Sequence, residues 1–326
     1  MPNLNVNSVD SEVKKVAESL YKKNKRSFRY LHEHLKRQAM NISPFYRDFI
    51  AKVINSSALK IEQKWFDGYL LPAEETSYSS SLSKRQANLV CADIRDSDIL
   101  FHELGHAVDF WFGDNQTLST SIIISNNKTM KDIFDEEFNA KHKEIYEKLM
   151  SEFKNIINSN INDKAYDILM NNMNLYNELC NLKVNSSDET VIQKRKEIHQ
   201  QLYRSGFVHI YYLLHQRHCY EILNKKYPTL LDALSSKYDF ESFSLYYHPR
   251  SYYLTSNNRD VYEVFANVFN AKITSKHFEL ELIKHFLPKT YDAFDKLFYI
   301  FYDHIQQNKR FNDVKIKKEQ SKDGLC

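Results

Sequence analysis

Glycine and proline are so scarce in this chain that most of it is expected to be helical. The 326 residues include five glycines and six prolines. These two residues interrupt helices and form tight turns, so a fold with many short strands is disfavoured. The chain is 42% hydrophobic and 14% aromatic, which is enough for a sizeable core. We therefore predict an α+β fold that is predominantly helical.

The hydrophobic pattern changes along the chain. Residues 10–58 have the period of amphipathic helices. Between 68 and 92, short hydrophobic runs alternate with serine-rich segments, which predicts a small sheet with a strand at Ala87–Ala92. The stretch from about 128 to 247 returns to charged amphipathic helical patterns.

Capping residues mark the helices around the sheet. One helix is predicted to begin near Asp96–Asp98 and end at Gly113, another to begin at Asp260, and a last one to cover Pro288–Ile305. These patterns predict a helical cap at 1–66, a main domain at 67–310 with a helical insertion at about 138–247, and a flexible tail at 311–326.

Charge and cysteine content exclude several classes of protein. The 45 basic and 42 acidic residues are mixed along the chain, so we expect no nucleic-acid partner. The four cysteines form no CxxC pair and suggest a reducing compartment. No run reaches the roughly 20 apolar residues of a membrane span, and the first residues lack the apolar core of a signal peptide. We expect a soluble monomer.

The helix predicted from Asp96–Asp98 contains two histidines one turn apart. Residues i and i+4 share a helix face, so His102 and His106 can direct ring nitrogens at one ion. Glu103 is then placed as a general base, and this His-Glu-x-x-His spacing is typical of zinc peptidases. The pair also interrupts a hydrophobic face that runs from Leu100 to Trp111, where uncompensated histidines would cost stability. We therefore favour zinc ligands over core histidines.

A catalytic zinc ion normally takes three protein ligands and keeps one position open. A third histidine six residues after His106 would define one class of zinc peptidase, but Phe112 occupies that position. The best candidate is Glu263, which is flanked by hydrophobic residues in a predicted helix and is therefore expected in buried surroundings. Glu136, Glu137 and His248 remain alternatives.

Several segments, in the same order, resemble the anthrax lethal factor-like family of endopeptidases, a branch of the glutamate-ligand zincins that includes the Pro-Pro endopeptidases. The resemblance lies in residues 68–72, 102–109, 132–137, 254–256, 263–266 and 287–291. It covers roughly 68–137 and 250–305. It implies a zincin-like domain with a small sheet and an active-site helix, zinc held by His102, His106 and Glu263, and Glu103 as the catalytic base.

The same resemblance implies a tyrosine hydroxyl that stabilises the oxyanion formed during hydrolysis. Ser256 and Asn257 occupy the matching positions in this chain, so the role passes to Tyr252 or Tyr253, of which we prefer Tyr253.

Two departures from the family concern the surroundings of the metal. Where the family has an acid that orients a zinc histidine, this chain has Asn267, whose amide oxygen can still accept a hydrogen bond. Asp109 is a further candidate for that role, or else a surface residue. Glu263 follows His106 by 157 positions, more than in lethal factor, and we expect the intervening helical insertion to shape the substrate cleft.

These features predict a zinc metalloendopeptidase with Zn²⁺ as cofactor and a protein or peptide as substrate. The substrate is expected to add as a strand to the edge of the sheet, at 87–92. By analogy with the family, we expect a bacterial effector or toxin, secreted without an N-terminal signal peptide, that acts in the host cytosol on a signalling or cytoskeletal protein such as actin. The alternative is a non-catalytic binding module that retains the zincin fold, although the intact Glu103 argues against it.

Overall fold

The computed structural model describes residues 11, 13–19, 39–55, 59–63, 65–66, 69–70, 77–81, 86–91, 97–110, 117–182, 187–238, 252–253 and 258–307. These residues are predominantly helical, as predicted. The chain divides into two compact units. Unit 1 comprises Met1–Ile133, Phe265–His277 and Lys289–Cys326, and unit 2 comprises Phe134–Val264 and Phe278–Pro288. The predicted cap at 1–66 falls in unit 1, the predicted insertion falls in unit 2, and the tail at 311–326 lies outside the described residues.

Unit 1 contains a three-stranded sheet in the order β1 (Leu59–Gln63), β5 (Gln86–Cys91), β4 (Ser77–Ser81). Strand β5 runs parallel to β1 and antiparallel to β4. A separate two-stranded sheet pairs β2 (Trp65–Phe66) with β3 (Tyr69–Leu70). The strand predicted at 87–92 is therefore confirmed as β5. Its prediction as an edge strand was wrong, because β5 has a hydrogen-bonded neighbour on both sides.

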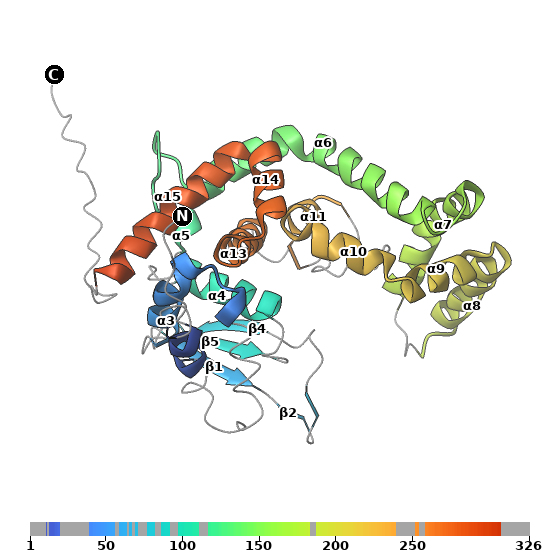
Figure 1. Cartoon of the computed structure of the whole chain (residues 1–326). Helices are drawn as coiled ribbons and strands as arrows, with labels where there is room; N and C mark the ends of the chain where they lie inside the picture. The colour runs from blue at the N-terminus through green and yellow to red at the C-terminus, as the bar shows by residue number, and fades with distance from the viewer. Residues whose placement is uncertain are drawn as a thin grey trace. The chain divides into compact units, whose positions relative to one another are not determined.

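Helix α4 (Ser97–Phe110) packs against β4 and β5 (Figure 1). It begins at a residue that was predicted as a possible helix start, and Gly113, its predicted end, lies outside the described residues. The predicted hydrophobic face is buried, with exposed fractions of 0 or 1% at Leu100, Phe101, Leu104, Ala107 and Val108. This burial fixes the rotation of α4 and therefore the direction of its histidines.

A phenylalanine core holds the other helices of unit 1 together, among them α3 (Arg47–Asn55), the second half of α13 (Arg259–Ile273), and α15 (Pro288–Gln306). The Phe265 ring lies 5.0 Å from that of Phe294, and the Phe269 ring lies 6.0 Å from that of Phe298. Phe49 approaches Phe298 to 5.7 Å. All five side chains are fully buried, so the second half of α13 has a fixed position. The short η1 (Pro44–Tyr46) and α5 (Leu118–Ser121) also belong to this unit.

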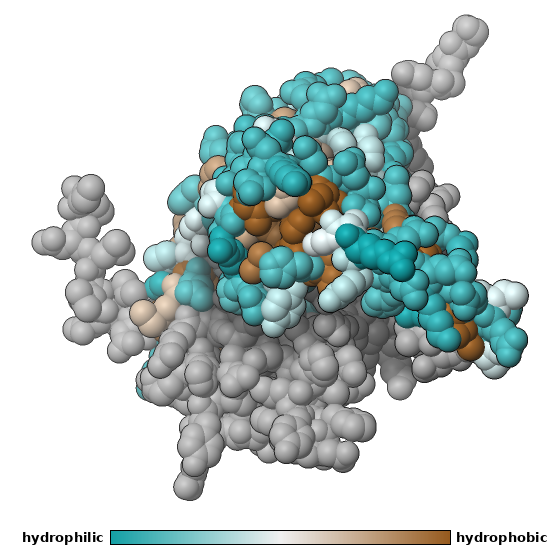
Figure 2. All heavy atoms as spheres, turned by 90° about the vertical axis from the view of Figure 1, so that its right-hand side faces the viewer, coloured by the Kyte–Doolittle hydropathy of each residue, from teal (hydrophilic) through white to brown (hydrophobic). Residues whose placement is uncertain are grey.

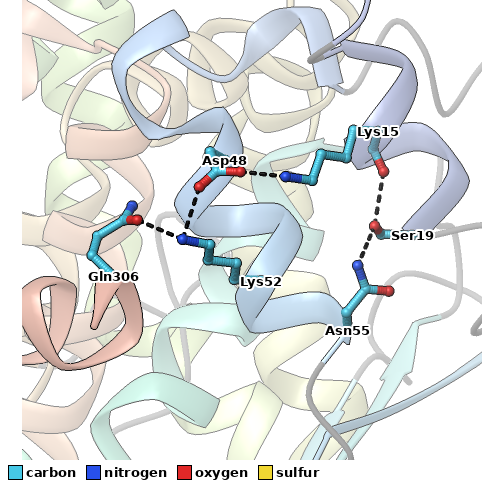
Figure 3. Close-up of polar contacts among 6 residues, drawn as sticks. All are labelled: Lys15, Ser19, Asp48, Lys52, Asn55 and Gln306. Atoms are coloured by element: carbon cyan, nitrogen blue, oxygen red, sulfur yellow. Dashed lines mark hydrogen bonds and ion pairs between the residues drawn. The ribbon is translucent and has the colours of Figure 1, made fainter. Parts of the chain in front are cut away.

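Polar contacts connect α3 to segments distant in sequence (Figure 3). Asp48 pairs with Lys15, from the helical residues 13–19, and with Lys52 at 3.1 Å. Lys52 also donates to Oε1 of Gln306, at the end of α15, over 2.7 Å. These charges are partly exposed, so each pair contributes little free energy, and the phenylalanine core carries most of the stability.

The described secondary structure of unit 2 consists of helices. They include the first half of α13, α6 (Met130–Asn158, which begins in unit 1), α7 (Asp163–Asn181), α8 (Glu189–Arg204), α9 (Phe207–Gln216), α10 (Cys219–Lys226), α11 (Pro228–Ser235) and most of α14 (His277–Phe286). Asn162 and Asp188 cap α7 and α8 with their side chains, and Pro228 starts α11. New helices therefore begin after Asp188 and at Pro228.

On the face shown in Figure 2, the described residues are mostly hydrophilic. Hydrophobic side chains gather mainly in one hollowed area near the centre of this face. None of the described helices combines the length and hydrophobicity that a membrane span requires.

Candidate metal centre

Helix α4 places His102 and His106 on one face with their ring nitrogens close together. The two Nε2 atoms lie 3.1 Å apart, and the rings are nearly perpendicular, at 89°. Two nitrogen ligands about 2.0 to 2.1 Å from a tetrahedral ion are separated by about 3.3 Å. The spacing of the two nitrogens is therefore close to that of a pair bound to one ion.

Asn267 of α13 determines which nitrogen of His102 carries the proton. Its Oδ1 lies 2.9 Å from Nδ1 of His102. An amide oxygen only accepts hydrogen bonds, so Nδ1 carries the proton and Nε2 keeps its lone pair. This is the protonation state that a metal ligand requires, and the amide oxygen of Asn267 lies where the sequence analysis expects an acceptor for a histidine.

A glycine allows α4 and α13 to approach each other closely. A Cβ added to Gly105 would lie 2.7 Å from Cα and 2.9 Å from the carbonyl oxygen of Ala266. Glu263 lies one helical turn before Asn267 on the same continuous helix. The contact between Gly105 and Ala266 therefore sets how far the Glu263 carboxylate lies from the two histidines.

His102, His106 and Glu263 form the only potential metal-binding group among the described residues. One ligand atom from each lies within 4.8 Å of the others. Glu263 is buried, with 1% of its surface exposed, and the histidines are half-buried. The structure thus brings together the three predicted ligands. Of the alternatives, Glu136 and Glu137 on α6 are not part of the group, and His248 lies outside the described residues.

Replacing Gly105 by Ala should weaken metal binding. Alanine favours the helix over glycine by about 1 kcal/mol, but the methyl group meets the backbone of Ala266, and such overpacking costs about 1 to 3 kcal/mol. We expect α13 to move away from α4 and the zinc affinity to fall at least tenfold in chelator competition. Gly206→Ala is the control: its positive φ of 81° makes it costly for stability, but it has no neighbour within 4 Å and should leave zinc affinity unchanged. Equal zinc affinity in both variants would contradict the close-approach argument.

The two tyrosines considered for the oxyanion have different partners. The Tyr252 hydroxyl donates to Oε1 of Glu263 at 2.8 Å. The Tyr253 hydroxyl donates instead to Oδ1 of buried Asp232 at 2.6 Å. The preferred candidate, Tyr253, is therefore engaged away from the metal ligands, and Tyr252 is the tyrosine that contacts one of them. The adjacent Ser256 and Asn257 lie outside the described residues.

Asp109, at the end of α4, is neither at the surface nor hydrogen bonded to a histidine. It is 1% exposed and accepts hydrogen bonds from the backbone nitrogen of Ser119, at 2.8 Å, and from its hydroxyl, at 2.9 Å. The carboxylate therefore connects α4 to α5. Burial raises its pKa to about 7, against the lowering effects of Ser119 and His106.

This raised pKa predicts a pH dependence of folding in the metal-free protein. The unfolded Asp109 has a pKa of about 3.9, so between pH 4 and 7 the folded state holds a proton that the unfolded state has released. Its contribution to stability is complete below pH 4 and is lost as the pH rises through 7. Asp109→Asn should therefore gain stability relative to the wild type across that interval, measured by urea unfolding with chelator present. Parallel pH profiles for the two proteins would contradict a buried, protonated Asp109.

No protein-family model, curated protein or solved structure that was compared with the chain matches it, so its function is inferred from the residues of the site themselves.

Proposed function

We propose that this protein is a zinc-dependent endopeptidase with its active site on α4. A single observation carries the proposal: His102, His106 and Glu263 converge, while Glu103 lies next to the first histidine on the same helix. A structural zinc site would use four protein ligands, whereas three ligands with an adjacent acid leave a coordination position for substrate or water.

The residues present suit a zinc ion. Two imidazoles and a carboxylate are common zinc donors, and the contact with Asn267 leaves the lone pair of His102 Nε2 available. A buried carboxylate such as Glu263 costs free energy unless hydrogen bonds or a cation compensate its charge. A zinc ion bound there would polarise a peptide carbonyl and lower the pKa of a water molecule.

Residues of the chain would then have separate roles in hydrolysis. Glu103 accepts the proton of the attacking water as the carbon–oxygen bond forms. It next donates that proton to the amine that leaves when the carbon–nitrogen bond breaks. Tyr252 lies beside the ligand carboxylate, and its hydroxyl donates its single proton to Oε1 of Glu263. Asn267 holds the His102 ring in one orientation throughout.

The substrate is proposed to be an extended segment of a protein that adds to the sheet at β4. Among the described strands, β4 pairs with β5 alone, and it also packs against α4. A peptide paired with β4 would therefore run past the helix that carries Glu103. A sheet that carries the proposed metal-binding helix, with a glutamate ligand from a later helix, supports the proposal of a zincin-like arrangement.

Two measurements test the proposal together. Purified protein should contain one zinc ion per chain, and it should cleave proteins of a cell lysate in a manner that depends on Glu103. Bound zinc with no cleavage dependent on Glu103 would favour the alternative of a non-catalytic binding module. Absence of bound zinc would overturn the proposed metal site.

A further inference from the structure

We propose that two consecutive tyrosines, Tyr252 and Tyr253, form a link that holds the third metal ligand in place. In this link, Asp232 of α11 fixes Tyr253, and Tyr252 holds one carboxylate oxygen of Glu263. Asp232, Tyr252 and Tyr253 are thus positioning residues for the metal. The inference rests on the metal site of the proposed function, but it does not depend on peptide cleavage.

Tyr252 is restrained on two sides. Its hydroxyl donates to Oε1 of Glu263 over 2.8 Å, and the guanidinium carbon of Arg259 lies 4.0 Å from the centre of its ring. Arg259 and Glu263 are one turn apart on α13, so the tyrosine lies along one face of that helix. A cation over the face of an aromatic ring attracts the ring, which favours the orientation that brings the Tyr252 hydroxyl to the carboxylate.

Tyr253 anchors this pair to a different helix. Its hydroxyl donates to Asp232 at 2.6 Å, and both side chains are buried, with 6% and 1% exposed. A hydrogen bond between two buried side chains contributes more than a surface contact of the same kind. The Tyr252 and Tyr253 rings also meet edge to face, with centroids 5.3 Å apart. A displacement at Asp232 would therefore be transmitted through both tyrosines to Glu263.

The link favours a particular way of binding the ion. A carboxylate can bind a metal through one oxygen or through both. With Oε1 of Glu263 engaged by the Tyr252 hydroxyl, binding through a single oxygen is favoured. A ligand set of two nitrogens and one oxygen then leaves a position open. Without the hydroxyl, the restraint on Oε1 is lost and binding through both oxygens becomes more favourable.

Cobalt(II) substitution tests this directly, because four-coordinate cobalt absorbs visible light more strongly than five-coordinate cobalt. The full-length chain would be loaded with cobalt(II), and zinc affinity would be measured in parallel by chelator competition. Tyr252→Phe should reduce the visible absorbance and lower zinc affinity by roughly tenfold, as removal of outer-shell partners does. Tyr253→Phe and Asp232→Ala should show the same changes to a smaller extent. Asp232→Asn keeps an oxygen acceptor for Tyr253 and should restore most of the wild-type spectrum.

Tyr262→Phe is the matched control. Tyr262 is adjacent to Glu263 in sequence, but its hydroxyl accepts a hydrogen bond from Asn258 at 3.2 Å, so its loss should change neither the spectrum nor the zinc affinity. Wild-type spectra in both Tyr252→Phe and Tyr253→Phe would overturn the link while leaving the zinc peptidase intact. A wild-type chain that binds neither metal would overturn both. If Tyr252→Phe keeps the wild-type spectrum but loses cleavage, the link is also overturned, and Tyr252 acts in the reaction alone.

Discussion

Replacing Glu103 by Gln is expected to reduce peptide cleavage by about 10²- to 10⁴-fold while the protein keeps its zinc. Glutamine has nearly the same shape as glutamate but accepts no proton at neutral pH. Glu103 is not among the three converging ligands, so metal content should stay at one ion per chain. The measurement is the rate of cleavage of lysate proteins or of a peptide library, with zinc determined on the same preparation.

Glu136→Gln gives the matched control for this prediction. Glu136 is an exposed acid on α6 that sequence reasoning kept as an alternative ligand. Its substitution should alter neither zinc content nor cleavage. If Glu103→Gln cleaves at the wild-type rate, the general-base role is wrong. If it loses zinc, Glu103 belongs to the ligand set instead.

The local parts of the fold were predictable because their signals lie within a few residues. The period of hydrophobic residues located α4, and the capping residues at 96–98 marked its start. The spacing of His102 and His106 followed from helix geometry alone. Each of these features is decided by side chains one or two turns apart, so no knowledge of tertiary structure was needed.

The arrangement of the sheet was less predictable, because strand pairing depends on distant partners. The run at 87–92 indicated a strand but not its neighbours, and β1, which lies before the predicted sheet region, pairs with it in parallel. A strand's own sequence does not show whether it lies at an edge or between two others. The edge was therefore assigned to β5, although β5 is the central strand of its sheet.

The different surroundings of the two tyrosines could not be read from the sequence, for a related reason. Tyr252 and Tyr253 are adjacent and chemically identical, so only their surroundings distinguish them. Those surroundings are Glu263 for one and Asp232 for the other, 11 and 21 positions away. Gly105 carried a clearer signal, since a glycine inside a helix costs about 1 kcal/mol and suggests a close backbone contact. That contact, with Ala266, is now seen to bring the two ligand-bearing helices together.

Replacing Glu263 by Ala should release the metal and remove zinc-dependent stabilisation. Loss of an outer-shell partner lowers metal affinity by about 10- to 100-fold, so loss of a ligand should lower it by more than 100-fold. A ligand that binds only the folded state stabilises it, by about 2.7 kcal/mol at 100 times its dissociation constant. Zinc at that concentration should therefore shift the urea midpoint of the wild type and leave that of Glu263→Ala unchanged.

Glu279→Gln separates this effect from the mere loss of a buried acid. Glu279 is also buried, on α14, but it accepts hydrogen bonds from Thr229 and is not part of the metal group. Its substitution should lower stability with or without zinc and preserve the zinc-induced shift. A full zinc shift in Glu263→Ala would mean that the third ligand comes from elsewhere in the chain. The approach of α13 to α4 through Gly105 would then serve packing alone, since the carboxylate it brings to His102 and His106 would not bind the ion.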